Sequence, residues 1–358
     1  MALKRSIRVL VVDDSAVVRR VLRERLEAEP GIDMVETATH GRIALHKLER
    51  VNPDIITLDV EMPTLDGLST LKQIMHRAPR PVIMLSAHTF DGAQKTLRAL
   101  ELGAVDFIQK PGGWSSKGVT EILDELVAKI KVLAPAKRPI PSPRAKIYSG
   151  FPLVAERKHP DAAGEPQSDR VVVVGASTGG TEAIRYLLGT LWADFPAGIV
   201  VTQHMPAGFT KAFALRLNEQ LPLEVREAEH HDLIRPGRVL IAPGHRHVTV
   251  HRDGQVGFVK LSNGPRVCGH RPSVDVLFES AAESFGSRAL GVILTGMGRD
   301  GANGLRVLRD AGGATVAQDE ATCVVFGMPK AAIEIGGAER VIPLPNIPAA
   351  IARFAHND

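Results

Sequence analysis

The stretch VVVVGASTGGTEAIRYLL, residues 171–188, joins an apolar run to a helical segment through a glycine-rich turn. Its residues 175–179, GASTG, fit the G-x-S-x-G pattern of a nucleophile elbow, in which small neighbours allow a tight turn that lifts a serine hydroxyl onto a helix N-terminus. A glycine-rich turn after a strand is equally typical of phosphate or dinucleotide binding. This stretch alone therefore predicts an α/β domain and leaves the role of Ser177 open.

Two other apolar runs of the same half end in residues of complementary chemistry. One leads into His204, and the other leads into a glycine-rich loop that contains Met297 and Asp300. Because the carboxyl ends of parallel strands meet at one edge of a sheet, we expect Ser177, His204 and Asp300 to converge. A serine needs a base to become nucleophilic, and the base needs an acid that fixes its tautomer. We interpret the three residues as a catalytic triad and the N–H of Met297 as a donor to an oxyanion.

Other polar residues of this half compete for functional roles. We interpret His230, His231, His245 and His247 as solvated loop histidines, since the pair at 245 and 247 has an arginine between its members and no carboxylate partner follows it at a metal-ligand spacing. For Arg271, Asp275 and Asp319, lining the pocket and forming structural salt bridges remain equal alternatives. The only two cysteines, Cys268 and Cys323, form neither a disulfide framework nor a metal site, and we expect both to pack as small apolar residues.

Two regions that both alternate strand-like and helix-like patterns lie on either side of a proline-rich segment. Short apolar runs alternate with amphipathic stretches in residues 6–132, and a second such pattern starts at Val171. Between Pro135 and Arg170 there are seven prolines, which indicates an extended linker whose ends lie roughly 30–35 Å apart if it is a flexible coil. We predict two doubly wound parallel-sheet domains, 1–132 and 169–358, joined by a linker over 133–168. The strands are predicted at Arg8–Val12, Met34–Ala38, Ile55–Leu58, Val82–Leu85, Asp106–Gln109, Val171–Val174, Gly198–Thr202, Arg238–Ala242, His247–His251, Ala289–Leu294 and Ala314–Ala317, and the helices include Val17–Glu29, Glu121–Leu133, Thr181–Leu191 and Ser273–Phe285.

Charged and hydroxyl side chains follow several strands of the first half. Asp13 and Asp14 follow the first strand and Asp59 follows the third, while Ser86 and Lys110 follow the fourth and fifth. Three carboxylates at one sheet edge repel each other unless a hard cation joins them, and Mg²⁺ prefers such oxygen ligands. A carboxylate nucleophile with a metal, a lysine and a hydroxyl suits a phosphoryl group. Each aspartate alone would more often be a helix cap, but five residues at matching strand ends favour a phosphoryl site.

The motifs VVDDS (11–15), LDVEMPTLDGL (58–68), LSA (85–87) and KP (110–111) resemble the flavodoxin-like receiver domain of response regulators over about 125 residues. The resemblance implies that Asp59 is the phosphoacceptor and that Ser86 and Lys110 contact the phosphoryl oxygens. It also implies a Mg²⁺ ion held by Asp13, Asp14, Asp59 and the backbone carbonyl of Glu61.

The motifs VVVVGASTGGTEA, VTQHMPAGFT (201–210), APGHRH (242–247), RPSVDVLFESAA (271–282), ILTGMGRDGANGL (293–305) and CVVFGMPKAA (323–332) resemble the catalytic domain of the chemotaxis protein-glutamate methylesterases, the CheB family. The resemblance implies hydrolysis of glutamyl methyl esters on chemoreceptors, deamidation of receptor glutamines, and no cofactor for ester hydrolysis. It implies the same triad, Met297 at the oxyanion hole and a chemotaxis histidine kinase as phosphodonor. The linker separately suggests that the tethered receiver inhibits the esterase until Asp59 is phosphorylated. The segment 267–270, VCGH, is less typical of the family.

Composition excludes several other classes of protein. A net charge of +4 over 358 residues is too small for the basic face of a typical nucleic-acid binder, and no apolar run approaches the roughly 18–20 residues of a membrane span. A transcription factor would need a basic helix-turn-helix in the strand-rich second half. A nucleotide-binding module would need an acidic ribose ligand where the chain has Gln203 and His204. We therefore expect a cytoplasmic monomer that neither binds nucleic acid nor inserts into membranes.

Overall fold

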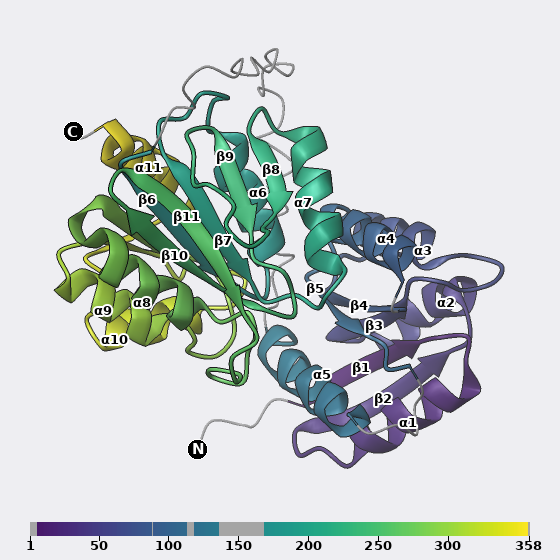
Figure 1. Cartoon of the computed structure of the whole chain (residues 1–358). Coiled ribbons are helices and arrows are strands. Elements are labelled where there is room, and N and C mark those ends of the chain that lie inside the picture. The colour runs from purple at the N-terminus through teal and green to yellow at the C-terminus, as the bar shows by residue number, and fades with distance from the viewer. Residues whose placement is uncertain (1–5, 88, 113–117, 136–167, 357–358) are drawn as a thin grey trace. The chain divides into compact units, whose positions relative to one another are not determined.

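The computed structural model describes residues 6–87, 89–112, 118–135 and 168–356. The chain divides into two compact units, Met1–Tyr148 and Ser149–Asp358. Each unit has its own parallel sheet covered by helices, which confirms the predicted fold class (Figure 1). Most of the predicted linker, residues 136–167, lies outside the described residues.

The first unit alternates strands and helices throughout. In chain order the elements are β1 (Ile7–Val12), α1 (Ala16–Glu27), β2 (Ile32–Ala38), α2 (Gly41–Val51), β3 (Ile55–Asp59), α3 (Gly67–Arg77), β4 (Val82–Ser86), α4 (Phe90–Glu101), β5 (Asp106–Gln109) and α5 (Val119–Leu133). The parallel sheet has the order β2-β1-β3-β4-β5, so β3 lies at its centre. Helices α1 and α5 pack on one face, and α2, α3 and α4 pack on the other.

All five predicted strands of this unit form, with ends that differ by no more than two residues. The central strands β3 and β4 are buried along their whole length, as expected for parallel strands covered on both faces. The edge strand β2 exposes part of its length to solvent. Helix α1 begins where the hydroxyl of Ser15 accepts a hydrogen bond from the Val18 N–H. Parallel pairing of β1 with β3, β3 with β4 and β4 with β5 aligns the carboxyl ends of these strands at one edge of the sheet.

The second unit is larger and contains more elements than the sequence analysis predicted. They are β6 (Val171–Ala176), α6 (Gly180–Gly189), β7 (Gly198–Gln203), α7 (Phe209–Gln220), β8 (Glu224–Glu227), β9 (Arg238–Ile241), β10 (His247–Asp253), β11 (Val256–Ser262), α8 (Val274–Phe285), the short 3₁₀ helix η3 (Gly286–Arg288), β12 (Ala289–Ile293), α9 (Ala302–Asp310), β13 (Ala314–Gln318), α10 (Met328–Glu334), β14 (Arg340–Ile342), the 3₁₀ helix η4 (Leu344–Asn346) and α11 (Ile347–His356).

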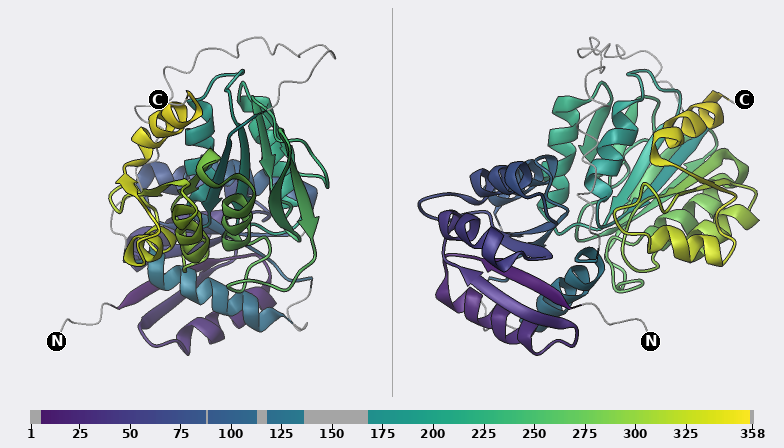
Figure 2. Two further views of the ribbon diagram at one scale, coloured as in Figure 1. Left: turned by 60° about the vertical axis from the view of Figure 1, so that its left-hand side comes forward. Right: turned by 180° about the vertical axis from the view of Figure 1, so that it is seen from behind.

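The seven-stranded sheet of this unit is parallel and has the order β14-β13-β12-β6-β7-β9-β8. From β6 the chain first proceeds towards β8, and after β12 it proceeds in the opposite direction towards β14. The direction therefore switches between β12 and β6, the kind of position where open α/β sheets place their ligand sites. Strand β10 is not part of this sheet, since it pairs antiparallel with β11 in a hairpin that packs on α8 (Figure 2).

The centre of the second unit is a nearly continuous apolar layer. The four valines of β6, residues 171–174, are fully buried, and β12 and β7 pair with it on either side. Gly175 must be small here, because a Cβ atom would lie 2.1 Å from Cγ1 of Val274 at the start of α8. This close packing brings the first turn of α8 against the carboxyl end of β6.

Candidate active site

The three residues of the predicted triad lie at the carboxyl ends of three adjacent strands. The N–H of Ser177, which follows β6, donates to the carbonyl of Thr295 beyond β12 at 3.0 Å. The N–H of His204, which follows β7, donates to the carbonyl of Ala176 at 3.0 Å. The ring Nε2 of His204 lies 2.7 Å from Oδ2 of Asp300. The sheet thus brings together three segments that are far apart in the sequence.

The carboxylate of Asp300 sits on the N-terminus of α8. Its Oδ1 accepts hydrogen bonds from the Ser273 hydroxyl at 2.7 Å and the Asp275 N–H at 3.1 Å, and its Oδ2 accepts from the Val274 N–H at 2.7 Å. Burial raises the pKa of Asp300, but the hydrogen bonds from His204, Val274 and Ser273 outweigh burial and lower it overall. The positive end of a helix therefore holds this acid in its charged form.

The imidazole of His204 is almost fully enclosed. Its side chain is 7% exposed and that of Asp300 is 1% exposed. With Nε2 bound to Asp300, the other nitrogen, Nδ1, is buried and has no hydrogen-bond partner among the described residues. The ring of His270 lies flat against the His204 ring, with centroids 3.8 Å apart and planes inclined by 11°.

The loop after β12 carries a backbone N–H, that of Met297, which could donate to a negatively charged oxygen. No described residue accepts a hydrogen bond from the N–H of Met297. Gly298 beside it has φ +87°, and a Cβ atom on Gly296 would lie 2.8 Å from Cβ of Ser177. These glycines therefore let the loop after β12 pass close to the serine.

Several supporting residues escaped the sequence analysis. The Gln203 side chain donates to the carbonyls of Ser177 and His204, at 2.9 and 3.1 Å, and so ties the two strand ends together. The Thr295 hydroxyl donates to the carbonyl of Thr178 at 2.9 Å. Gln203 directly precedes His204, and Thr295 lies two residues before Met297; only this proximity could have pointed to either residue. Ser273 had a clearer signal, since it directly precedes a predicted helix as an N-cap residue would.

The competing polar residues differ in part from the predictions. His247 is not solvated: it is 2% exposed, its Nε2 lies 2.9 Å from the carbonyl of Pro265, and its Nδ1 accepts from the Ser273 N–H. The prediction fails because the His247 ring is enclosed between Pro265 and the N-cap residue of α8, Ser273. Cys268 is exposed instead of packed, because it lies at the tip of a tight turn. Cys323 is half-buried, and His230, His231 and His245 are exposed, as expected for loop histidines.

The three remaining candidates take part in hydrogen bonds with neighbouring loops. Arg271 donates to the carbonyls of Asn263 and Gly264. Asp275 accepts from the Gly304 N–H at 2.7 Å, and burial raises its pKa. Asp319 accepts from the N–H of Thr322. None of the three forms a salt bridge with another described residue.

The acidic residues of the first unit also converge at a sheet edge. Asp13, Asp14 and Asp59 each offer a carboxylate oxygen, and these oxygens lie within 4.8 Å of one another. The ammonium group of Lys110 lies 2.8 Å from Asp13 and 2.7 Å from Asp59. Burial raises the pKa of Asp59 to about 6, although Lys110 opposes the shift. Three hard oxygen donors gathered within this distance fit a divalent cation.

The other expected members surround this cluster. Ser86 is fully buried at the end of β4 and donates to the carbonyl of Gly92 at 3.1 Å. The Glu61 carboxylate turns away from the cluster to pair with Lys95 at 2.8 Å, which leaves only its backbone for a metal. The caps of α1 and α3 are Ser15 and Asp66, so the clustered aspartates are not the helix caps that they would be in a purely structural role.

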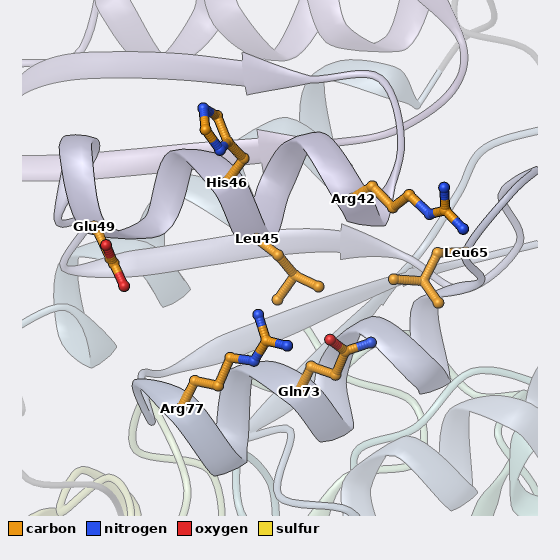
Figure 3. A pocket seen from close by; sticks show the side chains of 7 residues that line it. All are labelled: Arg42, Leu45, His46, Glu49, Leu65, Gln73 and Arg77. Carbon is orange, nitrogen blue, oxygen red and sulfur yellow. The ribbon is translucent and has the colours of Figure 1, made fainter.

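A separate open pocket lies between α2 and α3 of the first unit (Figure 3). The side chains of Arg42 and Leu45 from α2 line it together with those of Gln73 and Arg77 from α3. It contains none of the predicted site residues. Within the described ranges, no helix is long and apolar enough to cross a membrane.

The fold and the two clusters define a response regulator whose receiver is followed by an α/β domain of the serine-hydrolase type. Comparison with family models matches residues 172–351 to the CheB methylesterase family and residues 9–116 to the response regulator receiver domain. The chain belongs to the CheB methylesterase family.

Two curated relatives and one solved structure illustrate the similarity. The protein-glutamate methylesterase/protein-glutamine glutaminase of Symbiobacterium thermophilum is 48% identical over 360 residues, which cover 98% of this chain and 97% of that protein. The protein of the same name from Thiobacillus denitrificans is 45% identical, with 98% of each chain covered. The crystal structure of the Thermotoga maritima CheB methylesterase catalytic domain matches with 43% identity and a TM-score of 0.50, covering 52% of this chain and 98% of that one.

Proposed function

We propose that this chain is a phosphorylation-regulated protein-glutamate methylesterase. It hydrolyses glutamyl methyl esters on chemoreceptors, releases methanol, and also deamidates specific receptor glutamines. The observation that carries the proposal is the buried His204–Asp300 pair, 2.7 Å apart, beside Ser177 at the switch point of the second sheet. We assign residues 1–132 to the receiver, 133–168 to the linker and 169–358 to the catalytic domain.

The reaction follows from the roles that this geometry offers. The Oγ of Ser177 adds to the ester carbonyl carbon while its proton passes to His204. The bond to the methoxy group breaks, and His204 returns the proton so that methanol leaves. Water then attacks the acyl-enzyme, His204 takes the proton of the water, and the glutamate carboxylate and the serine are restored.

The two ring nitrogens of His204 have different tasks in this scheme. Nε2 donates to the charged Asp300, which stabilises the imidazolium that forms during attack. Nδ1, buried and without a described partner, is the nitrogen that accepts the serine proton. The N–H of Met297 then donates to the oxyanion, a contact whose loss typically costs about 10²–10³ in rate.

The direct test is methanol release from methylated receptor membranes by the full-length protein and by Ser177→Ala. We expect the variant to lose turnover and to keep the circular dichroism spectrum and melting temperature of the parent, because Ser177 lies in a turn and only its hydroxyl is removed. Retention of most of the activity would refute the triad.

The receiver fold and the acidic cluster of the first domain support a regulatory role for this domain. We propose that a chemotaxis histidine kinase phosphorylates Asp59, with Mg²⁺ held by Asp13, Asp14, Asp59 and the Glu61 carbonyl, and with Ser86 and Lys110 on the phosphoryl oxygens. When bound, the ion neutralises charge on the phosphoryl group. Tethering through the linker gives the receiver an effective concentration of the order of mM, so a weak contact suffices to inhibit the catalytic domain.

We expect a cytoplasmic monomer without affinity for nucleic acid or the membrane interior. Inhibition is tested by comparing methanol release from the unphosphorylated full-length protein and from a fragment starting at Asp169. Equal rates would show that the receiver does not inhibit.

A further inference from the structure

Residues 267–270, a segment less typical of the family, form a tight two-residue hairpin beside the active site. The N–H of Val267 donates to the carbonyl of His270 at 3.0 Å, and the N–H of His270 donates back at 2.9 Å. The two central residues, Cys268 and Gly269, have φ +50° and +82°. Positive φ at both positions is the signature of a type I′ turn, and a cysteine adopts it only at an energetic cost.

Side-chain contacts hold this turn against the start of α8. The Cys268 thiol lies 3.5 Å from Oδ2 of Asp275, which is the second residue of α8. The guanidinium of Arg266 donates to the carbonyl of Gly269 at 3.1 Å. The first turn of α8 also binds Asp300, so one helix terminus positions both the acid and the hairpin.

The hairpin presents His270 to the face of His204. The centroids are 3.8 Å apart and the planes nearly parallel, whereas the hydrogen bond to Asp300 contacts only one edge of the His204 ring. An edge contact alone leaves the ring free to tilt about the Nε2–Oδ2 line. A flat partner against its face removes this freedom.

We propose that His270 is a positioning residue that fixes the plane of His204, and with it the direction of Nδ1, the nitrogen assigned above to accept the Ser177 proton. The proposal rests on the esterase function proposed above. The flat shape of the His270 ring carries the role, because the two rings meet face to face. Any flat aromatic side chain at this position therefore maintains the base.

The test compares His270→Ala with His270→Phe in the full-length protein, by steady-state methanol release from methylated receptor membranes. We expect His270→Ala to lower kcat about 10- to 100-fold with KM within about twofold, since small misplacements of a catalytic group cost up to about 10² in rate. We expect His270→Phe to restore kcat to within about threefold of the parent. The matched control is His251→Ala, which removes an imidazole stacked on Phe258 in the β10–β11 hairpin and leaves the rate unchanged.

Each other outcome overturns the proposal. A kcat of His270→Ala within twofold of the parent means that the stack is not needed, and equal losses in both variants mean that the imidazole chemistry matters instead. A change confined to KM makes His270 a substrate contact.

A second readout separates this proposal from the esterase assignment, because it needs no turnover. We expect ¹⁵N NMR of the imidazoles to show the His204 Nε2–H protected from exchange in the parent and in His270→Phe, and about tenfold faster exchange in His270→Ala. An inactive parent with this pattern would refute the esterase function alone, and unchanged protection in His270→Ala would refute the positioning role.

Discussion

Replacement of Asp300 by asparagine tests how the second domain couples catalysis to stability. The carboxylate is 1% exposed, and each of its oxygens accepts two hydrogen bonds. An asparagine of the same shape keeps one accepting oxygen and places an NH₂ group at the other position. If the amide keeps the bonds from Ser273 and Asp275, its NH₂ faces the N–H of Val274 and the Nε2–H of His204.

The cost in stability follows from these contacts. The buried N–H of Val274 is left without an acceptor, at a cost of about 1–3 kcal/mol. The bonds with Ser273, Asp275 and His204 become bonds to a neutral amide, which costs roughly 1–3 kcal/mol more in total. Partial relaxation of the site reduces this sum. We therefore expect Asp300→Asn to lower the free energy of unfolding of the catalytic domain by about 3 kcal/mol at pH 7.

The cost in activity has a separate cause. The NH₂ group favours the His204 tautomer whose Nε2 accepts a hydrogen bond, which places the ring proton on Nδ1. That nitrogen then cannot take the proton of Ser177. By the general behaviour of Ser-His-Asp triads we expect kcat to fall by about 10⁴.

The pH dependence gives a signed check. The folded pKa of Asp300 is lower than its unfolded value, so the charged form stabilises the fold above the unfolded pKa of about 3.9. This contribution is lost as the pH falls through the folded pKa. The stability difference between parent and Asp300→Asn should therefore be full at pH 5–7 and shrink below about pH 4.

The assay is calorimetric unfolding of the full-length protein between pH 3 and 7, together with methanol release at pH 7. The control Asp310→Asn removes an exposed carboxylate that pairs with Arg306 on α9, and it should change stability by less than about 0.5 kcal/mol. Activity above one tenth of the parent, or a stability difference that grows towards low pH, would refute this account of Asp300.

Two further predictions concern the packing behind the candidate active site and the cation expected at the acidic cluster. Gly175→Ala places a Cβ atom 2.1 Å from Val274, so we expect a loss of about 1–3 kcal/mol and reduced esterase activity from the displaced start of α8; a melting temperature equal to that of the parent would contradict this packing. Chelation of Mg²⁺ should abolish phosphorylation of Asp59 by a small-molecule phosphodonor and leave unphosphorylated methanol release unchanged; phosphorylation that persists in excess chelator would show that Asp13, Asp14 and Asp59 need no cation.

Much of the fold could be predicted because short buried runs and turn residues carry strong local signals. The valines before Ser177 and the apolar runs before Asp59 and Ser86 are strands that the sequence pattern alone locates. The weak strands β8 and β14 escaped because they lie at the edges of the sheet, where charged residues are tolerated. The β10–β11 hairpin escaped because periodicity does not reveal which strands pair.

The local sequence by itself determined which side chains follow each strand, and this was enough to name Ser177, His204 and Asp300 as partners. Only the tertiary structure decided how they are held: Asp300 on the N-terminus of α8, His247 buried against Ser273, and His270 flat against His204. The physical reason is that strand ends are set by local residue patterns, whereas the capping of a carboxylate and the stacking of two rings depend on loops that pack from distant parts of the chain.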